Sequence, residues 1–320
     1  MILTVTLNAA IDKTHLIPDF TLGRVNRPVE TMALAGGKGI NVARALKALD
    51  EPVFATGLVA GRAGTFIEGS LAKEGISHAF EHGISGESRT CLAVIHPETG
   101  ETTEINEAGA PVDAATHARL LGRIEAWLPN VSWLVLSGSM PPGLTGESYL
   151  AMMELARAAG KPVSLDTSGP ALAEALAGRP DVVKPNQHEA EALLGYAVTP
   201  ETLNRAVAEL LDHGPRILAL SLGADGAVVA TAEEAWYYAA PPVRVVNPIG
   251  SGDSFLAGLI AALQRGRSLV DAGRLAVACG SANAAVAGAA ACERPLIETL
   301  LPMVTPAPLS EASWAIGTTA

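Results

Sequence analysis

The sequence has few cysteines, few aromatic residues and no excess of basic residues, and each shortage excludes a class of protein. The three cysteines, Cys91, Cys279 and Cys292, have no Cys-x-x-Cys spacing and lie in apolar or alanine-rich surroundings. They indicate reduced core thiols of a cytoplasmic protein rather than a disulfide or zinc framework. The net charge of −11 argues against nucleic acid as the main partner, because phosphate backbones attract basic surfaces.

Long apolar runs and paired histidines are missing as well. No run reaches the roughly 18 apolar residues of a membrane span. The N-terminus has no basic region followed by an apolar stretch and a cleavage site, so we expect no signal peptide and no membrane partner. The seven histidines lack His-Glu-x-x-His spacing, which argues against a histidine metal site.

Glycine and alanine are plentiful, and this composition suits close packing of helices on a sheet. A chain of 320 residues can bury a large core without disulfides or metals. Residues 2–7 and 53–58 are predicted to be buried strands, and from residue 133 onward strands alternate with helices as in a parallel α/β sheet. Residues 15–34 and 89–106 are predicted to form small strands outside that sheet, the second pair as a hairpin.

Polar residues follow several of the predicted strands of the main sheet. These residues are Asp12, Ser137, Asp166, Lys184, Asn186 and Ser221. The carboxyl ends of parallel strands meet at one edge of a sheet, and ligands of open α/β sheets bind at that edge. The set therefore predicts a binding site there more strongly than any single residue does.

The stretch from Asn247 to Phe255 predicts a tight turn followed by a helix. Gly250-Ser251-Gly252 would lie at the helix N-terminus, where free N–H groups and the helix dipole favour an anion. Asp253 adds a carboxylate in the first turn, beside those donors. This pairing of a base with anion-binding amides suits phosphoryl transfer to a hydroxyl group. Taken alone, however, Asp253 more often only stabilises the start of its helix.

A second glycine-rich stretch, Gly36-Gly37-Lys38-Gly39-Ile40-Asn41, opens another predicted helix. It is not a Walker A loop, because Met32 occupies the place of its first glycine and Gly39 that of its Ser or Thr. A plain glycine-rich helix start remains an equal alternative for this stretch alone. Similarly, a lone Arg89 would usually be a solvated strand end.

Together these motifs resemble the ribokinase-like (PfkB) carbohydrate kinases, most closely the phosphosugar branch of 1-phosphofructokinases and tagatose-6-phosphate kinases. The resemblance runs from residue 2 to about residue 288 and follows the order of the motifs in that family. It rests on residues 6–12, 36–41, 137–139, 184–186 with Glu189, 221–223 and 250–253. Ala9 stands where the branch usually has proline, and Ser251 where many members have alanine.

The resemblance implies a role for each matching residue. Asp253 resembles the catalytic base, and the amides of Gly250, Ser251 and Gly252 resemble the anion hole. The residues that resemble the sugar-phosphate side are Asp12, Arg27, Gly37, Lys38, Asn41, Arg89, Ser137 and Gly138. Those that resemble the nucleotide side are Lys184, Asn186, Glu189, Ser221, Gly223, Gly226 and Asn283. Asn186 and Glu189 resemble the pair that places the Mg²⁺–phosphate assembly through water.

The resemblance also implies a fold and a set of ligands. We expect a three-layer α/β sandwich with a mostly parallel central sheet, as one domain over residues 1–304. Lid strands are inserted at about residues 13–34 and 89–106, and a C-terminal tail covers residues 305–320. ATP and Mg²⁺ are the implied cofactors, with a monovalent cation such as K⁺ as an option. A phosphosugar is the implied substrate, and the lid is expected to pair with a second subunit.

Fructose 1-phosphate is the favoured substrate, because residues 102–107 and 25–27 look most like the 1-phosphofructokinases. Tagatose 6-phosphate and fructose 6-phosphate remain alternatives. A nicotinamide-dependent dehydrogenase is disfavoured, because no Gly-x-Gly-x-x-Gly follows the first strand. A non-catalytic sugar-binding protein of this fold is also disfavoured, since both Asp253 and the Gly-Ser-Gly turn are present.

Overall fold

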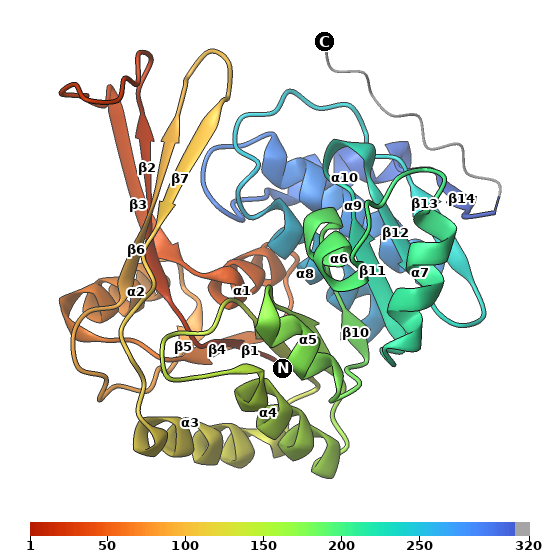
Figure 1. Ribbon diagram of the computed structural model, residues 1–320, viewed down its shortest axis with the longest axis horizontal. Coiled ribbons are helices and arrows are strands. Elements are labelled where there is room, and N and C mark those ends of the chain that lie inside the picture. Colours follow the sequence, from red (N-terminus) through yellow and green to blue (C-terminus); the bar gives the residue numbers. More distant parts are fainter. Residues whose placement is uncertain (311–320) are drawn as a thin grey trace.

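The computed structural model describes residues 1–310. In this part of the chain a ten-stranded main sheet has the order β14-β13-β12-β11-β10-β9-β8-β1-β4-β5 (Figure 1). Its strands are β1 (Ile2–Thr6), β4 (Val53–Gly57), β5 (Ser77–His78), β8 (Trp133–Ser137), β9 (Val163–Asp166), β10 (Val182–Val183), β11 (Ile217–Ser221), β12 (Ala227–Ala230), β13 (Ala235–Tyr238) and β14 (Pro306–Pro308).

The strands from β5 to β11 in this order are parallel, as the sequence predicted. β1 lies between β4 and β8, and all five of its residues are buried, which fits its mostly apolar and β-branched sequence. The carboxyl ends of β8, β9 and β11 carry Ser137, Asp166 and Ser221, and Lys184 follows β10 directly. The predicted polar edge of the sheet is therefore confirmed.

The other end of the main sheet is antiparallel. β11, β12, β13 and β14 pair in turn, with Pro308 of β14 opposite Trp236 of β13. β14 falls within the tail that we expected to lie outside the domain, so the sheet extends past the boundary predicted at residue 304. The short run lacked a periodic pattern because two of its three residues are prolines. Residues 311–320 of the predicted tail lie outside the described residues.

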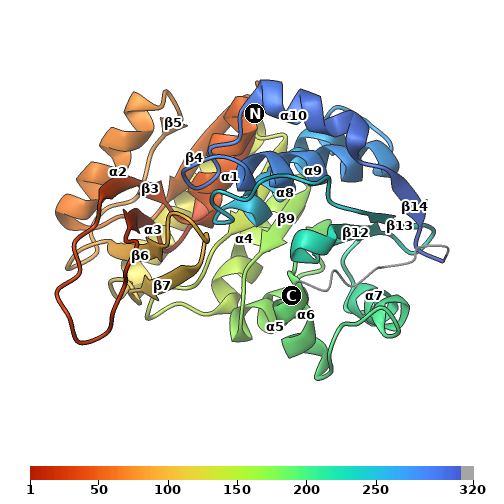
Figure 2. The ribbon, with the colours of Figure 1, turned by 90° about the horizontal axis from the view of Figure 1, so that it is seen from above.

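Helices cover both faces of the main sheet, as Figure 2 shows from above. On one face lie α3 (Ala114–Trp127), α4 (Gly146–Ala158), α5 (Pro170–Leu176), α6 (Gln187–Leu194) and α7 (Leu203–Asp212). On the other lie α1 (Lys38–Ala48), α8 (Ser251–Gln264), α9 (Leu269–Ala284) and α10 (Arg294–Leu300). Alternate residues of β8 separate the two cores: Leu134 and Leu136 face the first, whereas Val135 faces the second. This is the predicted three-layer arrangement.

A separate four-stranded sheet, here called the lid sheet, stands beside the main sheet (Figure 1). Its order is β3 (Glu30–Gly36), β2 (Ala10–Leu16), β6 (Arg89–Ile95) and β7 (Thr102–Asn106). The predicted hairpin of β6 and β7 is present. Asp12, which we placed at the end of the first main strand, lies instead inside β2, because β1 already ends at Thr6. α2 (Gly61–Lys73) packs near β2 and β3.

No helix within residues 1–310 combines the length and the apolar character needed to cross a membrane.

Candidate active site

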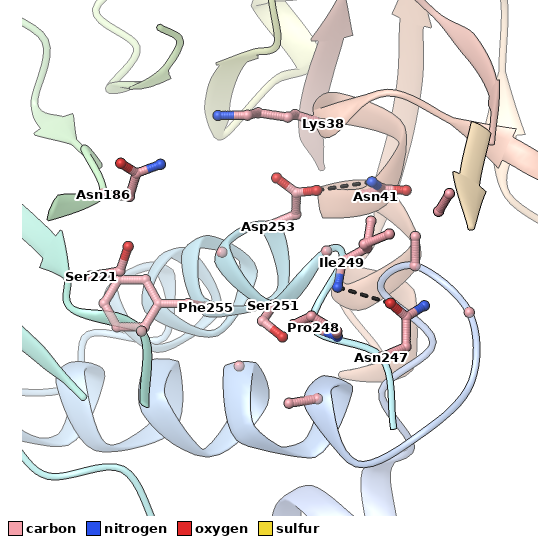
Figure 3. Close-up of a pocket in the computed structure, with 18 of the residues that line it drawn as sticks. Lys38, Asn41, Asn186, Ser221, Asn247, Pro248, Ile249, Ser251, Asp253 and Phe255 are labelled. Atoms are coloured by element: carbon pink, nitrogen blue, oxygen red, sulfur yellow. Dashed lines mark hydrogen bonds between the residues drawn. The ribbon is translucent and has the colours of Figure 1, made fainter. Parts of the chain in front are cut away.

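A cavity of about 880 Å³ opens between the lid sheet and the carboxyl edge of the main sheet. The lid sheet, the start of α1, the loops after β10 and β11, and the first turn of α8 all contribute to its walls. Figure 3 shows Asp253 between Asn41 on one side and Asn186 and Ser221 on the other. Segments that are far apart in the sequence therefore meet here, as the sequence analysis expected.

The turn before α8 is built from local hydrogen bonds. Asn247 Oδ1 accepts the Ile249 N–H at 3.0 Å, and the Ser251 N–H donates to Pro248 O at 3.1 Å. Gly250 has φ of +83°, and the backbone of Ala290 leaves no room for a Cβ at this position. Both the positive φ and the lack of room for a side chain therefore require glycine at position 250.

The first amides of α8 point to its free end, where an α-helix has no acceptors of its own. The Ser251 amide, which we expected in the anion hole, is used by Pro248 inside the turn. The amides of Gly250 and Gly252 remain the candidates for an anion. A Cβ placed on Gly252 would lie 3.4 Å from Lys184 Nζ, so an ammonium group stands close to these amides.

Asp253 lies in the first turn of α8 and is 6% exposed. Its Oδ2 accepts the Asn41 amide N–H at 2.9 Å. Burial and, less strongly, the nearby Asp166 carboxylate raise the pKa of Asp253, whereas Lys38, Asn41 and Lys184 lower it; the net pKa is about 6. A carboxylate with a pKa near neutrality is a better general base than an ordinary aspartate.

Asp166 gathers two lysines next to Asp253. Lys38 Nζ lies 2.8 Å from Asp166 Oδ1, and Lys184 Nζ lies 3.3 Å from Asp166 Oδ2. Burial would raise the pKa of Asp166, but Lys184 and Lys38 hold it below its ordinary value. Burial would lower the pKa of Lys38, but Asp166, Glu189 and Asp253 raise it above its ordinary value. Lys38 therefore stays charged beside the anion-binding turn.

The sequence analysis placed Asp166 at the sheet edge but gave it no role. The position of Asp166 at the end of a strand could be predicted from the sequence, but only the fold brings Lys38 and Lys184 to this carboxylate. The resemblance placed Lys38 on the sugar-phosphate side together with Arg27 and Arg89, and in the structure Lys38 contacts Asp166 and, at 3.4 Å, Glu189. In Figure 3 its side chain extends away from Asn41.

Asn186 and Glu189 form a capping box at the start of α6. Asn186 Oδ1 accepts the Glu189 N–H at 2.8 Å, and Glu189 Oε2 accepts the Asn186 N–H at 2.9 Å. The Asn-x-x-Glu spacing therefore has a structural explanation. Glu189 Oε1 still faces Lys38, and both residues line the cavity.

The lid side of the cavity carries Asp12 and Arg89. Arg89 Nε donates to Asn8 O at 3.2 Å and Nη1 to Glu107 O at 3.3 Å, which fixes its side chain at the base of the lid sheet. Burial raises the pKa of Asp12, although Arg44 and Arg89 lower it. Cys91 also lines this wall and is partly exposed, so our expectation of a core thiol was wrong for this cysteine.

Four predicted site residues lie outside the cavity wall. Arg27 is exposed on the loop between β2 and β3, and so does not join Arg89. Ser137 is fully buried, and Gly138 O is occupied by the hydroxyls of Tyr149 and Thr167. Asn283 is also fully buried and donates to Ile249 O and Ser251 Oγ, both at 2.9 Å. Gly138 and Asn283 therefore support the site from behind, because Gly138 O and Asn283 Nδ2 bond within the fold.

The remaining predicted residues line the cavity. They are Gly37, Lys38, Asn41, Lys184, Asn186, Glu189, Ser221, Gly223, Gly226, Gly250, Ser251, Gly252 and Asp253. The sequence analysis missed an apolar wall made by residues 240–243 and by Val277 and Ala284 of α9. The small residues of α9 have two roles. Ala276 packs closely against Gly258 of α8, and Gly280 and Ser281 line the cavity.

The polar residues of the cavity can accommodate Mg²⁺ only together with a substrate. Residues 1–310 hold no group of three or more His, Cys, Asp or Glu side chains spaced for a metal ion. Mg²⁺ commonly keeps several waters and uses one or two carboxylates plus phosphate oxygens. Glu189, whose Oε1 lies 3.4 Å from Lys38 Nζ, and the nearby Asn186 both line the cavity and fit that mode of binding.

Comparisons with known proteins agree with this geometry. Residues 5–295 match the model of the pfkB family carbohydrate kinases. Phosphofructokinase-2 of Escherichia coli, solved with potassium, is 29% identical, with a TM-score of 0.86 and coverage of 97% of this chain and 99% of that chain.

Two further structures are comparably similar. A provisionally assigned 1-phosphofructokinase of Thermotoga maritima is 28% identical, with a TM-score of 0.87 and coverage of 96% and 99% of the two chains. A provisionally assigned phosphofructokinase of Staphylococcus aureus is 31% identical, with a TM-score of 0.79 and coverage of 96% and 98%. The family model spans nearly the whole chain, and the chain therefore belongs to the pfkB family of carbohydrate kinases.

Proposed function

We propose that the protein phosphorylates a phosphoketohexose with ATP, and that fructose 1-phosphate, giving fructose 1,6-bisphosphate, is its preferred substrate. The observation that carries the proposal is the position of Asp253. A buried carboxylate with a pKa of about 6 lies directly beside the Gly250–Gly252 turn and faces the same cavity as Arg89 of the lid sheet. A base, an anion site and a cation for a distal phosphate are thus in one cavity.

Asp253 acts as the general base in this proposal. It removes the proton from the C6 hydroxyl of the sugar as that oxygen attacks the γ-phosphorus of ATP. The bond between the γ-phosphorus and the bridging oxygen of ADP breaks, and ADP leaves with the electron pair. Asn41 holds one oxygen of Asp253 at 2.9 Å, which leaves the other oxygen for the proton.

The transferring phosphoryl group carries negative charge that needs donors and cations. The amides of Gly250 and Gly252 supply the donors, and Lys184, close to Gly252, supplies a positive charge. Lys38 adds a second positive charge from across Asp166. Preorganised donors and charges of this kind commonly contribute more to phosphoryl transfer than any covalent step does.

ATP is proposed to lie along the other end of the cavity, next to Ser221, Gly223 and Gly226, with its base against the apolar wall of α9. Mg²⁺, placed by Asn186 and Glu189 through water, would neutralise charge on the phosphates. Potassium is a further candidate cofactor, because the E. coli relative was solved with it. Asp12 and Arg89 are proposed to bind the sugar phosphate from the lid side.

The choice of fructose 1-phosphate rests on β7, whose residues Glu104 and Asn106 line the cavity and belong to the 102–107 stretch that resembles 1-phosphofructokinases. Fructose 6-phosphate has independent support, since a similar E. coli phosphofructokinase-2 structure contains it. Tagatose 6-phosphate remains a third option, because the three sugars have similar length and can bind in either direction.

Steady-state kinetics with the three sugar phosphates tests this proposal. We expect the highest kcat/KM for fructose 1-phosphate, measured as ADP release at fixed ATP and Mg²⁺. A preference of about tenfold for another sugar, or about 1.4 kcal/mol in transition-state binding, would overturn the substrate choice but not the kinase assignment. Absence of ADP release with all three sugars, in a protein that binds them, would favour a non-catalytic sugar-binding protein instead.

A further inference from the structure

Arg44 of α1 has no place in the mechanism above, yet its hydrogen bonds lead directly to the catalytic turn. All five N–H donors of its guanidinium are used. Nε and Nη2 donate to Glu74 at 2.6 and 3.1 Å, and Nη2 also donates to Ala35 O at 2.7 Å. Nη1 donates to Asn41 Oδ1 at 2.9 Å and to Ala289 O at 3.0 Å.

These five acceptors come from four separate parts of the molecule. Glu74 caps the end of α2, Ala35 belongs to β3 of the lid sheet, Asn41 lies on α1, and Ala289 follows α9. The Arg44 side chain is only 12% exposed, and the Glu74 side chain is 23% exposed. Such a partly buried bidentate pair is far more constrained than a surface ion pair.

The contact with Asn41 decides how the Asn41 amide is turned. Arginine has only donors, so the atom of Asn41 that faces Arg44 must be its oxygen. The amide nitrogen of Asn41 then faces Asp253 and donates to Oδ2. The reverse orientation would place a carbonyl oxygen against the Asp253 carboxylate.

We propose that Arg44 is a positioning residue of the catalytic base: it locks the Asn41 amide so that Asn41 donates to Asp253. The contact of Arg44 with Ala289 supports the same turn, because the Ala289–Ala290 backbone lies against Gly250. This role rests on the proposed function only in that Asp253 is taken as the base. The hydrogen bonds themselves hold for any use of Asp253.

Arg44→Lys is the sharpest test, because lysine keeps the positive charge but has three donors and no planar fork. The other groups that face Asp253, namely Asp166, Lys38 and Lys184, are unchanged in this variant. Arg265→Lys is the matched control. Arg265 donates to Glu51 and to Leu49 O at the opposite end of α8, outside the cavity.

We expect Arg44→Lys to lower kcat at pH 7 at least tenfold relative to Arg265→Lys, with a smaller change in KM. The acid limb of its kcat–pH profile should move to higher pH. A donor to a carboxylate favours the ionised form, so weakening it raises the pKa. Glu74→Gln, which keeps the shape of the partner, should move the limb in the same direction by less.

A second readout needs no substrate. The Asp253 carboxyl is titrated by ¹³C NMR in protein labelled at aspartate, and its signal is identified by its loss in Asp253→Asn. We expect Asp253 to titrate at higher pH in Arg44→Lys than in wild type or Arg265→Lys. If Arg44→Lys does not fold, Glu74→Gln decides by the same two measurements.

An unchanged Asp253 titration in the folded variants overturns the positioning role, even if kcat falls, because general loosening of α1 would produce that result. Wild-type protein that phosphorylates no sugar instead contradicts the proposed function. The NMR titration then still decides whether Arg44 sets the Asn41–Asp253 contact.

Discussion

The two walls of the cavity are built in opposite ways. Around the start of α8, Asp253, Asp166 and Lys184 are all at most 6% exposed, and ion pairs or hydrogen bonds hold their side chains. The lid sheet is open: every residue of β7 after Thr102 is exposed, and Ile105 is 55% exposed. One wall is part of the core, and the other is a surface.

This difference follows from what each wall must do. Buried charges are tolerated only where partners compensate them, so the wall at α8 is fixed by its own contacts before any substrate arrives. That preorganisation suits a site that stabilises developing charge. β7, in contrast, is an edge strand of the lid sheet with mostly exposed side chains, so packing fixes this part of the cavity wall less firmly. Changes in the first wall should therefore affect turnover, and changes in the second should affect substrate binding.

The largest effect is expected at the wall of α8. Asp253→Asn should reduce kcat by about 10²- to 10⁴-fold, the usual contribution of a positioned base, while leaving ATP binding nearly unchanged. Single-turnover kinetics measures the chemical step directly. A variant that keeps more than about a tenth of the wild-type rate would remove Asp253 from the role of base.

The stability of Asp253→Asn provides its control. The pKa of Asp253 is raised to about 6 in the folded protein, so its protonated form is favoured and stability is lost as pH rises through that value. Asparagine does not ionise, so the variant does not lose folding stability through this residue over this pH range. The variant should be more stable than wild type at pH 8, by about 1–3 kcal/mol, and should show no such gain at pH 4. Denaturant unfolding at the two pH values measures both differences.

An intermediate effect is expected on the lid side, at Arg89. Arg89→Ala should raise KM for the sugar phosphate by about 10- to 100-fold, because a charge-assisted contact contributes roughly 1.5–3 kcal/mol. KM for ATP should stay the same. Arg27→Ala is the matched control, since Arg27 is exposed on the lid loop outside the cavity. Equal KM changes in the two variants, or equal use of the unphosphorylated sugar, would contradict this role of Arg89.

The smallest effect on turnover is expected at the outer surface of the lid. Leu22, Val25 and Val29 are 86%, 78% and 69% exposed on the loop between β2 and β3. We propose that a second copy of the chain covers them, since exposed apolar side chains and open strand edges favour pairing. A tetrameric form of E. coli phosphofructokinase-2 shows that a relative can assemble.

Sedimentation velocity tests this pairing. Wild type should sediment as a dimer at micromolar concentration, and Leu22→Ser combined with Val25→Ser should shift it toward the monomer with a change in kcat of less than about threefold. A monomeric wild type would rule out the dimer.

Glycine motifs and strand ends could be interpreted from the sequence because their reasons are local. The unusual backbone angle at Gly250 and the mostly apolar, β-branched sequence of β1 depend on a few neighbouring residues. The same local rules failed at Asp12, whose strand belongs to a different sheet from the one before it. They also failed at β14, where pairing with β13 rather than propensity decides the structure.

By itself, then, the sequence determined the α/β class, the edge of the sheet that carries the site, and the candidate base at Asp253. Only the tertiary structure decided which charges meet there. Lys38 is 128 residues from Asp166 and Asn41 is 212 residues from Asp253, so no local pattern can pair them. The same holds for Arg44, whose donors reach Ala289 across 245 residues. Their partners are fixed by the packing of α1 and α8 on one face of the sheet, which places the starts of both helices at the same cavity.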